Sequence, residues 1–462
     1  MKRLLEVREF DIISGNSAFR DDPAVRYCEF FESLKKFALE SASRNSGSDV
    51  LEFMKPGFRR DIGEFISIRN YVGVIRLGNG CQVQILPKID CGSAEEPAGV
   101  SAKRVFLRML KCLKDFPGKR LSEATLSADR LDLWEIFIRM FLDETAKLTR
   151  QGLKSAYIEK QENISVYRGK LLANHNIRHN AAHKERFFMA FDEYQLNRPE
   201  NRLIKSALLR LLRLTASYDT AKEIRKLLTA FELVEPSRNF ARDFSGVSLD
   251  RHTNAYEAPL KWARVFLQNR SFSPFSGSEN AISLLFPMEK IFEAYVAANL
   301  KRIGAAYDLK ISVQDRGCYL FDRLNGEDCR KFALRPDIVL TRTSGTGHRR
   351  LERIIIDTKW KRLTNDRSKN YGISQADMYQ MFVYAQKYET PEIWLVYPLS
   401  REMCFFGEIS FESVGAAGNT SCAVSVFPVD LTRITASLEE LLARIEEQLS
   451  RRRAFAHPDY SG

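Results

Sequence analysis

Residues Leu334–Leu363 have the sequence LRPDIVLTR, TSGTGHRR, LERIIIDTKWKRL, and this stretch decides the fold of the C-terminal part of the chain. Two apolar runs rich in β-branched residues flank a Ser/Gly/Thr segment, which predicts two strands joined by a turn. Asp337 opens the first strand, just after a proline, and Asp357 ends the second. Residues two apart on a strand face the same side, so Asp357 and Lys359 are predicted to point together. If the strands pair as a hairpin, Asp337 lies near Asp357.

These three side chains have the chemistry of a Mg²⁺ site. Magnesium prefers oxygen ligands and is typically held by one or two carboxylates, water and substrate phosphate. We therefore predict Asp337 and Asp357 as metal ligands, and Lys359 as the group that orients a water or neutralises developing charge. An Asp-x-Lys also occurs at 308–310, but no Pro-Asp strand precedes it, so we reject that copy. The alternative is a turn aspartate at 337 and a solvated strand end at 357–359.

Helices on either side of this stretch add candidate site residues. A capping box predicts the start of a helix over 375–388. Met378, Met381, Phe382 and Ala385 are predicted to share its apolar face. Gln380 and Tyr384 are predicted to share its polar face, from which they could line a cleft beside the metal. Upstream, a helix over 287–302 carries Glu293, a candidate further acidic ligand or base. Both helices also fit ordinary amphipathic helices that expose these residues to solvent.

Outside this stretch, apolar periodicity divides the chain into three regions. Residues 1–98 are predicted to form a small β-rich N-terminal domain, and residues 99–275 a mainly helical middle region. Residues 276–462 are predicted to form an α/β domain with a central mixed sheet flanked by helices, which makes the protein α+β and multidomain. The remaining predictions are linkers at 91–103 and 270–280, helices at 131–149, 198–214, 221–233 and 438–453, an extended segment at 157–172, and strands at 65–68, 72–77, 82–86, 309–313, 337–342, 353–359 and 393–397.

Composition narrows the class of protein. The 462 residues exceed one ordinary core, and a net charge of +12 favours a polyanionic partner such as nucleic acid. No apolar run approaches the roughly 20 residues of a membrane span, and charges interrupt the first ten positions, so we expect a cytoplasmic protein without a membrane partner. The eight cysteines form no C-x-x-C pair, which argues against a zinc ribbon. No G-x-x-x-x-G-K-[ST] motif is present, so the chain itself is not expected to bind a nucleotide.

Three histidines form a separate candidate cluster. His175, His179 and His183 are four residues apart, which would place them on one face of a continuous helix. Such a face can bind a metal, but without a Cys or carboxylate partner it is more often a polar surface that meets phosphate or another protein. The sequence leaves these alternatives open.

In their order along the chain, the candidate residues resemble the PD-(D/E)XK nuclease superfamily in its RecB-like form. These residues are Glu293, Pro336-Asp337, Asp357-Thr358-Lys359 and Gln380-x-x-x-Tyr384. More narrowly, residues 60–400 resemble the McrC family, the nuclease subunit of the McrBC system that restricts DNA containing 5-methylcytosine. The segments that carry this narrower resemblance are YVGVI at 71–75, ILPKI at 85–89, Gly152-Leu153, Tyr157, RGK at 168–170, NRLIK at 201–205 and the helix from Met288 to Tyr295.

The resemblance implies a DNA endonuclease that depends on a partner. McrC-like proteins cleave modified double-stranded DNA only together with McrB, a hexameric AAA+ GTPase whose activity they stimulate. The β-rich N-terminal region would dock into that ring. Residues 1–60 and 415–462 match nothing in the family, which leaves open a divergent partner or a different recognised modification. Carried over, Asp337 and Asp357 bind the metal, Lys359 is the catalytic lysine, and Glu293, Gln380 and Tyr384 support them.

Two other functions fit the same residues. The chain could be a non-cleaving structural activator of a ring NTPase, in which the metal site is silent. It could also be a restriction endonuclease that cleaves DNA by itself with Mg²⁺.

Overall fold

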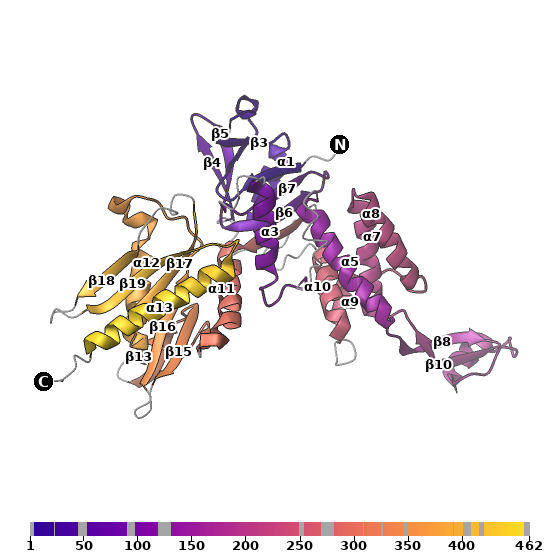
Figure 1. The fold of residues 1–462 in the computed structure, drawn as a ribbon. Coiled ribbons are helices and arrows are strands. Elements are labelled where there is room, and N and C mark those ends of the chain that lie inside the picture. The colour runs from indigo at the N-terminus through magenta and orange to yellow at the C-terminus, as the bar shows by residue number, and fades with distance from the viewer. Residues whose placement is uncertain are drawn as a thin grey trace.

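The chain is a mixed α/β protein built from several sheets and helices that fold into more than one domain (Figure 1). The computed structural model describes residues 4–22, 24–44, 53–89, 98–118, 131–248, 254–268, 281–307, 309–324, 327–344, 350–390, 392–400, 408–414 and 420–456. Within these residues, no helix combines the length and the apolar character needed to cross a bilayer. The predicted linker at 270–280 and the rejected Asp308 lie outside the described residues.

The N-terminal region contains two four-stranded sheets. One has the order β3-β2-β5-β4, and helix α1 (Phe31–Arg44) packs beside it. The other has the order β1-β7-β6-β11, and the predicted strands at 65–68, 72–77 and 82–86 are all confirmed as β5, β6 and β7. The bounds are β1 Leu4–Arg8, β2 Ile12–Ser14, β3 Val25–Tyr27, β4 Met54–Arg59, β5 Gly63–Ile68, β6 Tyr71–Leu77, β7 Gln82–Leu86 and β11 Ala281–Pro287.

Strand β11 was missed in the sequence, although it joins two distant parts of the chain. It pairs antiparallel with β6 over its full length, and nearly all of its residues are buried. A strand buried on both faces is a continuous apolar run without alternation, so its periodicity gave no signal. The close pairing requires Gly73, where an added Cβ would lie 1.9 Å from the carbonyl oxygen of Leu284. The linker predicted at 91–103 is wrong from Ala98, where helix α3 (Ala98–Leu110) begins.

The middle region is a helical bundle whose core is aromatic. Trp134 and Phe137 of α5 pack against Trp262 and Phe266 of α10, with ring centroids 5.7–6.0 Å apart. Asp132 caps the start of α5 by accepting from the Glu135 amide at 2.8 Å. The helices predicted at 131–149 and 198–214 are confirmed as α5 and α7, and the one at 221–233 starts and ends earlier, as α8. The bundle contains α5 (Leu133–Gln151), α7 (Pro199–Leu214), α8 (Tyr218–Leu228), α9 (Phe240–Ser245) and α10 (Glu257–Gln268).

A small β-rich arm projects from the end of this bundle, away from the rest of the molecule (Figure 1). It consists of β8 (Ala156–Ile164), β9 (Lys170–Leu171), helix α6 (Ala173–Asn180) and β10 (Phe187–Gln195), with the sheet order β8-β10-β9. The prediction of a mainly helical middle region is therefore incomplete. The extended segment predicted at 157–172 covers β8 and β9, but their antiparallel partner β10 was not predicted.

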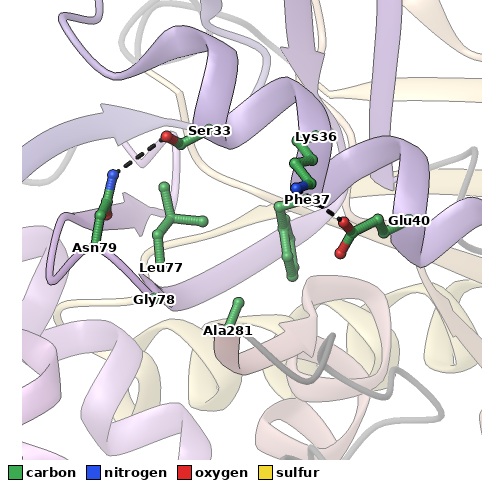
Figure 2. Close-up of a pocket in the computed structure, with 8 residues that line it drawn as sticks. All are labelled: Ser33, Lys36, Phe37, Glu40, Leu77, Gly78, Asn79 and Ala281. Carbon is green, nitrogen blue, oxygen red and sulfur yellow. Dashed lines mark hydrogen bonds and ion pairs between the residues drawn. The ribbon is translucent and has the colours of Figure 1, made fainter.

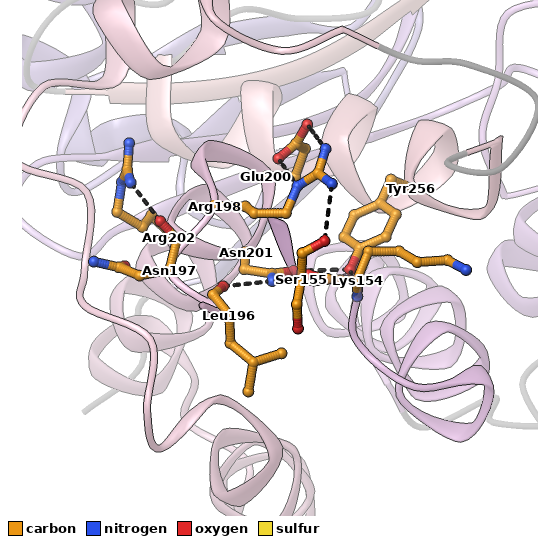
Figure 3. A network of polar contacts seen from close by, with 9 residues as sticks. All are labelled: Lys154, Ser155, Leu196, Asn197, Arg198, Glu200, Asn201, Arg202 and Tyr256. Atoms are coloured by element: carbon orange, nitrogen blue, oxygen red, sulfur yellow. Dashed lines mark hydrogen bonds and ion pairs between the residues drawn. The ribbon is translucent and has the colours of Figure 1, made fainter. Parts of the chain in front are cut away.

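The arm is attached to the bundle through buried hydrogen bonds (Figure 3). The Tyr256 hydroxyl donates to Asn201 Oδ1 at 2.9 Å and accepts from the Lys154 amide at 2.8 Å. Asn201 Nδ2 donates to the carbonyl oxygens of Lys154 and Leu196, at 3.1 and 2.7 Å. These two carbonyls lie just before β8 and just after β10. One side-chain pair therefore fixes both ends of the arm.

The three histidines do not form one helical face. His175 and His179 lie on α6 with their ring centroids 6.3 Å apart, and both stack on Phe188. Helix α6 ends at Asn180, so His183 lies beyond it and contacts Glu185 at 3.2 Å. In the described part of the chain, no group of three or more His, Cys, Asp or Glu side chains forms a ready-made metal site.

The C-terminal region is a six-stranded mixed sheet with the order β12-β15-β16-β17-β19-β18. Alternate residues of β16 face opposite sides: Ile354 and Ile356 belong to the core shared with α11 and α13, and Ile355 to the core shared with α12. The sheet is thus covered by helices on both faces. The bounds are α11 Met288–Gly304, β12 Lys310–Val313, β13 Tyr319–Leu324, β14 Glu327–Ala333, β15 Ile338–Ser344, β16 Arg350–Thr358, α12 Gln375–Tyr388, β17 Glu392–Pro398, β18 Ile409–Val414, β19 Thr420–Val429 and α13 Ile434–Ala456.

Candidate active site

The predicted hairpin brings the two aspartates together. Strands β15 and β16 pair antiparallel, with Ile338 opposite Ile356, so Asp337 lies beside the end of β16 that carries Asp357. The Thr358 amide and its hydroxyl both donate to Asp337 Oδ2, each at 2.7 Å. The pairing of the two strands therefore fixes the position of the Asp337 carboxylate.

Lys359 joins the aspartates to helix α12. Its Nζ lies 2.7 Å from Asp357 Oδ2 and donates to Gln380 Oε1 at 3.1 Å. Gln380 Nε2 in turn donates to the Tyr384 hydroxyl at 2.7 Å. Four of the predicted residues, Asp357, Lys359, Gln380 and Tyr384, thus form one continuous polar chain from the sheet to the helix.

Helix α12 has the predicted bounds, and Met381 and Ala385 of its predicted apolar face are buried, but two of its side chains depart from the prediction. The sequence pattern placed Phe382 on the buried side and Tyr384 on the polar side, yet Phe382 is 45% exposed and Tyr384 is 3% exposed. The reason is that the buried side satisfies its polar groups: Tyr384 bonds with Gln380, and Asp377 accepts from Lys361 at 2.7 Å. A helix face can be buried with polar residues when each has a partner.

Glu293 reaches the same site from helix α11. Its Oε1 accepts from Gln314 Nε2 at 2.9 Å, and the backbone amide of Gln314 donates to the Asp337 carbonyl at 2.8 Å. Gln314 has a φ of 49°, in the left-handed region that is unfavourable for residues with a side chain. Strained backbone of this kind often occurs at functional sites. Gln314 was not predicted, because no sequence pattern indicates a glutamine in that conformation.

The carboxylates of the site retain protons more strongly than usual. Asp357 is 1% exposed, and burial together with the negative charge of Asp337 raises its pKa to about 7, although Lys359 opposes the shift. Burial also raises the pKa of Asp337, against the two hydrogen bonds from Thr358. Burial and the charge of Asp337 raise the pKa of Glu293 to about 7. Burial lowers the pKa of Lys359, but the contact with Asp357 and the charges of Asp337 and Asp377 together raise it more.

This arrangement fits a divalent cation. Two neighbouring carboxylates share one ammonium group, so the site has an excess of negative charge in a poorly solvated position. A cation between the aspartates would remove their mutual repulsion. Because only two carboxylates adjoin directly, the donor set suits Mg²⁺, which keeps water and takes substrate phosphate as its other ligands. Asp337 and Asp357 would hold the ion.

A contact from the N-terminal sheet reaches the residue that follows Lys359. The Trp360 indole N–H donates to both oxygens of Glu9, at 3.2 and 3.1 Å, and the Lys88 amide donates to the same carboxylate at 3.3 Å. Glu9 is fully buried, and burial raises its pKa to about 7. Because 351 positions separate Glu9 from Trp360, no local pattern in the sequence could indicate this contact.

Comparisons with known proteins place this geometry in context. A family model described as McrBC 5-methylcytosine restriction system component matches residues 66–398. None of the curated proteins compared with the chain matches it. One similar structure is a chain of the refined half-complex from the tetradecameric assembly of Thermococcus gammatolerans McrB AAA+ hexamers with bound McrC. Its sequence is 16% identical to this chain, its TM-score is 0.65, and the match covers 95% of this chain and 100% of that one. A chain of the Thermococcus gammatolerans McrBC complex is 22% identical with a TM-score of 0.46, covering 65% of this chain and 87% of that one. The first of these structures shares its fold with this chain.

Proposed function

Because the chain belongs to the family of McrBC 5-methylcytosine restriction system components, we propose that it is the Mg²⁺-dependent DNA endonuclease subunit of such a system. One observation supports this proposal most directly. The Asp357–Lys359 ion pair, 2.7 Å long, lies beside Asp337 where two paired strands meet. Acidic groups and one ammonium group in this arrangement are those that phosphodiester hydrolysis with a bound metal requires.

In this proposal the C-terminal region is a PD-(D/E)XK nuclease domain, and each polar group has a defined role. Asp337 and Asp357 hold Mg²⁺, which when bound supplies Lewis acidity at the scissile phosphate. Lys359 faces the reacting phosphate with its positive charge, and Gln380 orients the ammonium group through their hydrogen bond. Tyr384 orients Gln380 in turn. Glu293, whose raised pKa lies near neutrality, accepts a proton.

The proposal includes a partner and a modified substrate. The substrate is double-stranded DNA that contains modified cytosine, and the partner is a McrB-like hexameric AAA+ GTPase whose hydrolysis this chain stimulates. One chain that is similar in fold comes from an assembly of McrB AAA+ hexamers with bound McrC, which supports a partner of this kind. The N-terminal region is proposed as the docking surface. The projecting arm of residues 156–195 is the alternative surface in the test below.

Replacement of Asp357 tests the nuclease assignment. In a mixture of the chain, the partner ring, GTP, Mg²⁺ and methylated DNA, Asp357→Ala is expected to abolish cleavage and leave stimulated GTP hydrolysis intact. Glu412→Ala, which changes an exposed acid on β18 of the same sheet, is the matched control and should cleave normally. Full cleavage by Asp357→Ala would refute the assignment.

Two further outcomes separate the competing functions. GTPase stimulation by the unaltered chain without any DNA cleavage would identify a structural activator. Cleavage by the unaltered chain with Mg²⁺ alone would identify a self-sufficient endonuclease. Charge reversals at exposed sites of the N-terminal sheets and of the arm locate the docking surface, because only those at the true surface should remove GTPase stimulation.

A further inference from the structure

A groove of about 660 Å³ begins at the candidate active site and follows helix α11. Its lining comes from α11 and from the loop that follows α3, at residues 112–116. Val313, Gln314 and Glu293 line it at the end that adjoins the candidate active site. Since Gln314 bonds to both Glu293 and the Asp337 backbone, the groove and the carboxylates share one wall.

The edge of this groove carries three lysines without partners. Lys114, Lys290 and Lys301 line it, and within the described residues none of their ammonium groups has a hydrogen-bond or ion-pair partner. The lining includes one further acidic residue besides Glu293, Asp115, so positive charge prevails. A pocket of about 310 Å³ between α1 and the turn after β6 provides a contrast (Figure 2): there Lys36 pairs with Glu40 at 3.8 Å and Asn79 donates to Ser33 at 3.2 Å.

The floor of the groove is apolar. Ala294 and Ala298 present their small side chains from α11, with Ala297 largely buried between them, and Val313 lies next to Gln314. Lys290 and Lys301 are eleven residues apart on the helix, which corresponds to about 16 Å along its axis. That length matches the rise of a few nucleotides of one DNA strand. An apolar floor with cations along its edge is complementary to bases on one side and phosphates on the other.

We propose that this groove binds one strand of the DNA substrate, with its phosphates at Lys114, Lys290 and Lys301 and its bases over the alanine floor. This inference rests on the proposed nuclease function, because the strand in the groove is the one that continues into the candidate active site. Charge alone would attract DNA to any basic surface. The groove adds continuity with Glu293 and an apolar surface on which the bases of a locally unpaired strand can lie.

Binding of a labelled oligonucleotide tests this inference without any cleavage. The full-length chain is titrated with a fluorescent single-stranded DNA in a buffer that contains EDTA. The triple variant Lys114→Gln/Lys290→Gln/Lys301→Gln is expected to bind about tenfold or more weakly, and its slope of log K against log salt should be smaller by about 2. Lys222→Gln, an exposed lysine on α8, is the matched control and should bind normally.

A second variant distinguishes DNA binding in the groove from nonspecific attraction of DNA to positive charge. Ala298→Trp fills the apolar surface of the groove without changing the charge of the protein. Because position 298 is exposed on α11, the variant is expected to fold normally. It is expected to weaken binding several-fold with an unchanged salt slope. Normal binding by Ala298→Trp, or by the triple-lysine variant, would overturn the inference. Because the assay contains no metal, these results are independent of whether Asp357→Ala abolishes cleavage, so the groove and the nuclease assignment can fail separately.

Discussion

Thr358 holds the Asp337 carboxylate through two donors on one residue. The backbone amide and the hydroxyl both bond to the same oxygen of Asp337, so the other oxygen is left for a ligand. A carboxylate that is oriented in this way loses less freedom when it binds a metal. Groups that orient metal ligands typically affect metal affinity or activity by about 10–100-fold.

Removal of the Thr358 hydroxyl should therefore weaken metal-dependent cleavage. Thr358→Val keeps the shape and the amide donor but loses the hydroxyl donor, so the Mg²⁺ concentration for half-maximal cleavage is expected to rise by about tenfold or more. Cleavage is measured over a Mg²⁺ titration. Thr358→Ser keeps the hydroxyl and serves as the control. Equal Mg²⁺ requirements for Thr358→Val and the unaltered chain would contradict the proposed role.

The sequence predicted correctly those site residues whose positions follow from the geometry of a single strand or of a hairpin. Asp357 and Lys359 are two apart, and Asp337 precedes the partner strand, so period-two alternation and hairpin pairing bring them together. Gln314 and Glu9 could not be predicted. The first depends on an unusual backbone conformation and the second on the packing of a different sheet, neither of which leaves a local pattern.

Among the elements, helix α12 shows the limits of periodicity. Its predicted range and its Ser374 cap are confirmed, because capping and amphipathic spacing are local properties. Its buried face was predicted only in part, because Met381 and Ala385 are buried as predicted, whereas the apolar Phe382 is exposed and the polar Tyr384 is buried. Whether a polar residue is buried depends on its partners, and those lie in other elements. Strands β10 and β11 were missed for related reasons: the first completes a sheet within an apparently helical region, and the second has no alternation.

The hydrogen bonds at the base of the arm should contribute measurably to stability. Tyr256→Phe removes one hydroxyl, which leaves the buried Asn201 Oδ1 and the Lys154 amide without that partner. The expected loss is about 1–3 kcal/mol in the free energy of unfolding, because buried unsatisfied groups are costly. Urea denaturation measures it. Tyr218→Phe, at a tyrosine that is 77% exposed, should change nothing. An unchanged midpoint for Tyr256→Phe would show that the network adds no stability.

For the whole molecule, Glu9 couples folding to pH. The pKa of its carboxyl is raised from 4.5 to about 7 by burial, so between these values the folded chain keeps a proton that the unfolded chain has lost. Stability therefore falls as pH rises from about 4.5 to about 7, and the full loss of roughly 3 kcal/mol is reached above that range. The contribution of Glu9 to the free energy of unfolding is therefore fully present below pH 4.5 and absent above pH 7.

Glu9→Gln should remove this component of the pH dependence. The amide cannot ionise but still offers an oxygen to the Trp360 N–H, so the difference in unfolding free energy between variant and unaltered chain should grow in favour of the variant from pH 5 to pH 8. Thermal or urea unfolding at several pH values measures the difference. Glu32→Gln, at an exposed position of α1, is the control with no such trend. A pH-independent difference for Glu9→Gln would show that Glu9 is ionised throughout.

Strand β11 runs into helix α11 without an intervening loop, because Pro287 ends the strand and Met288 begins the helix. One continuous piece of backbone therefore belongs to the N-terminal sheet at one end and carries Glu293 at the other. Because no loop lies between strand and helix to absorb a movement, a change in the orientation of the sheet would reorient α11 as well. The position of Glu293 beside the candidate site therefore depends on how the N-terminal sheet is held.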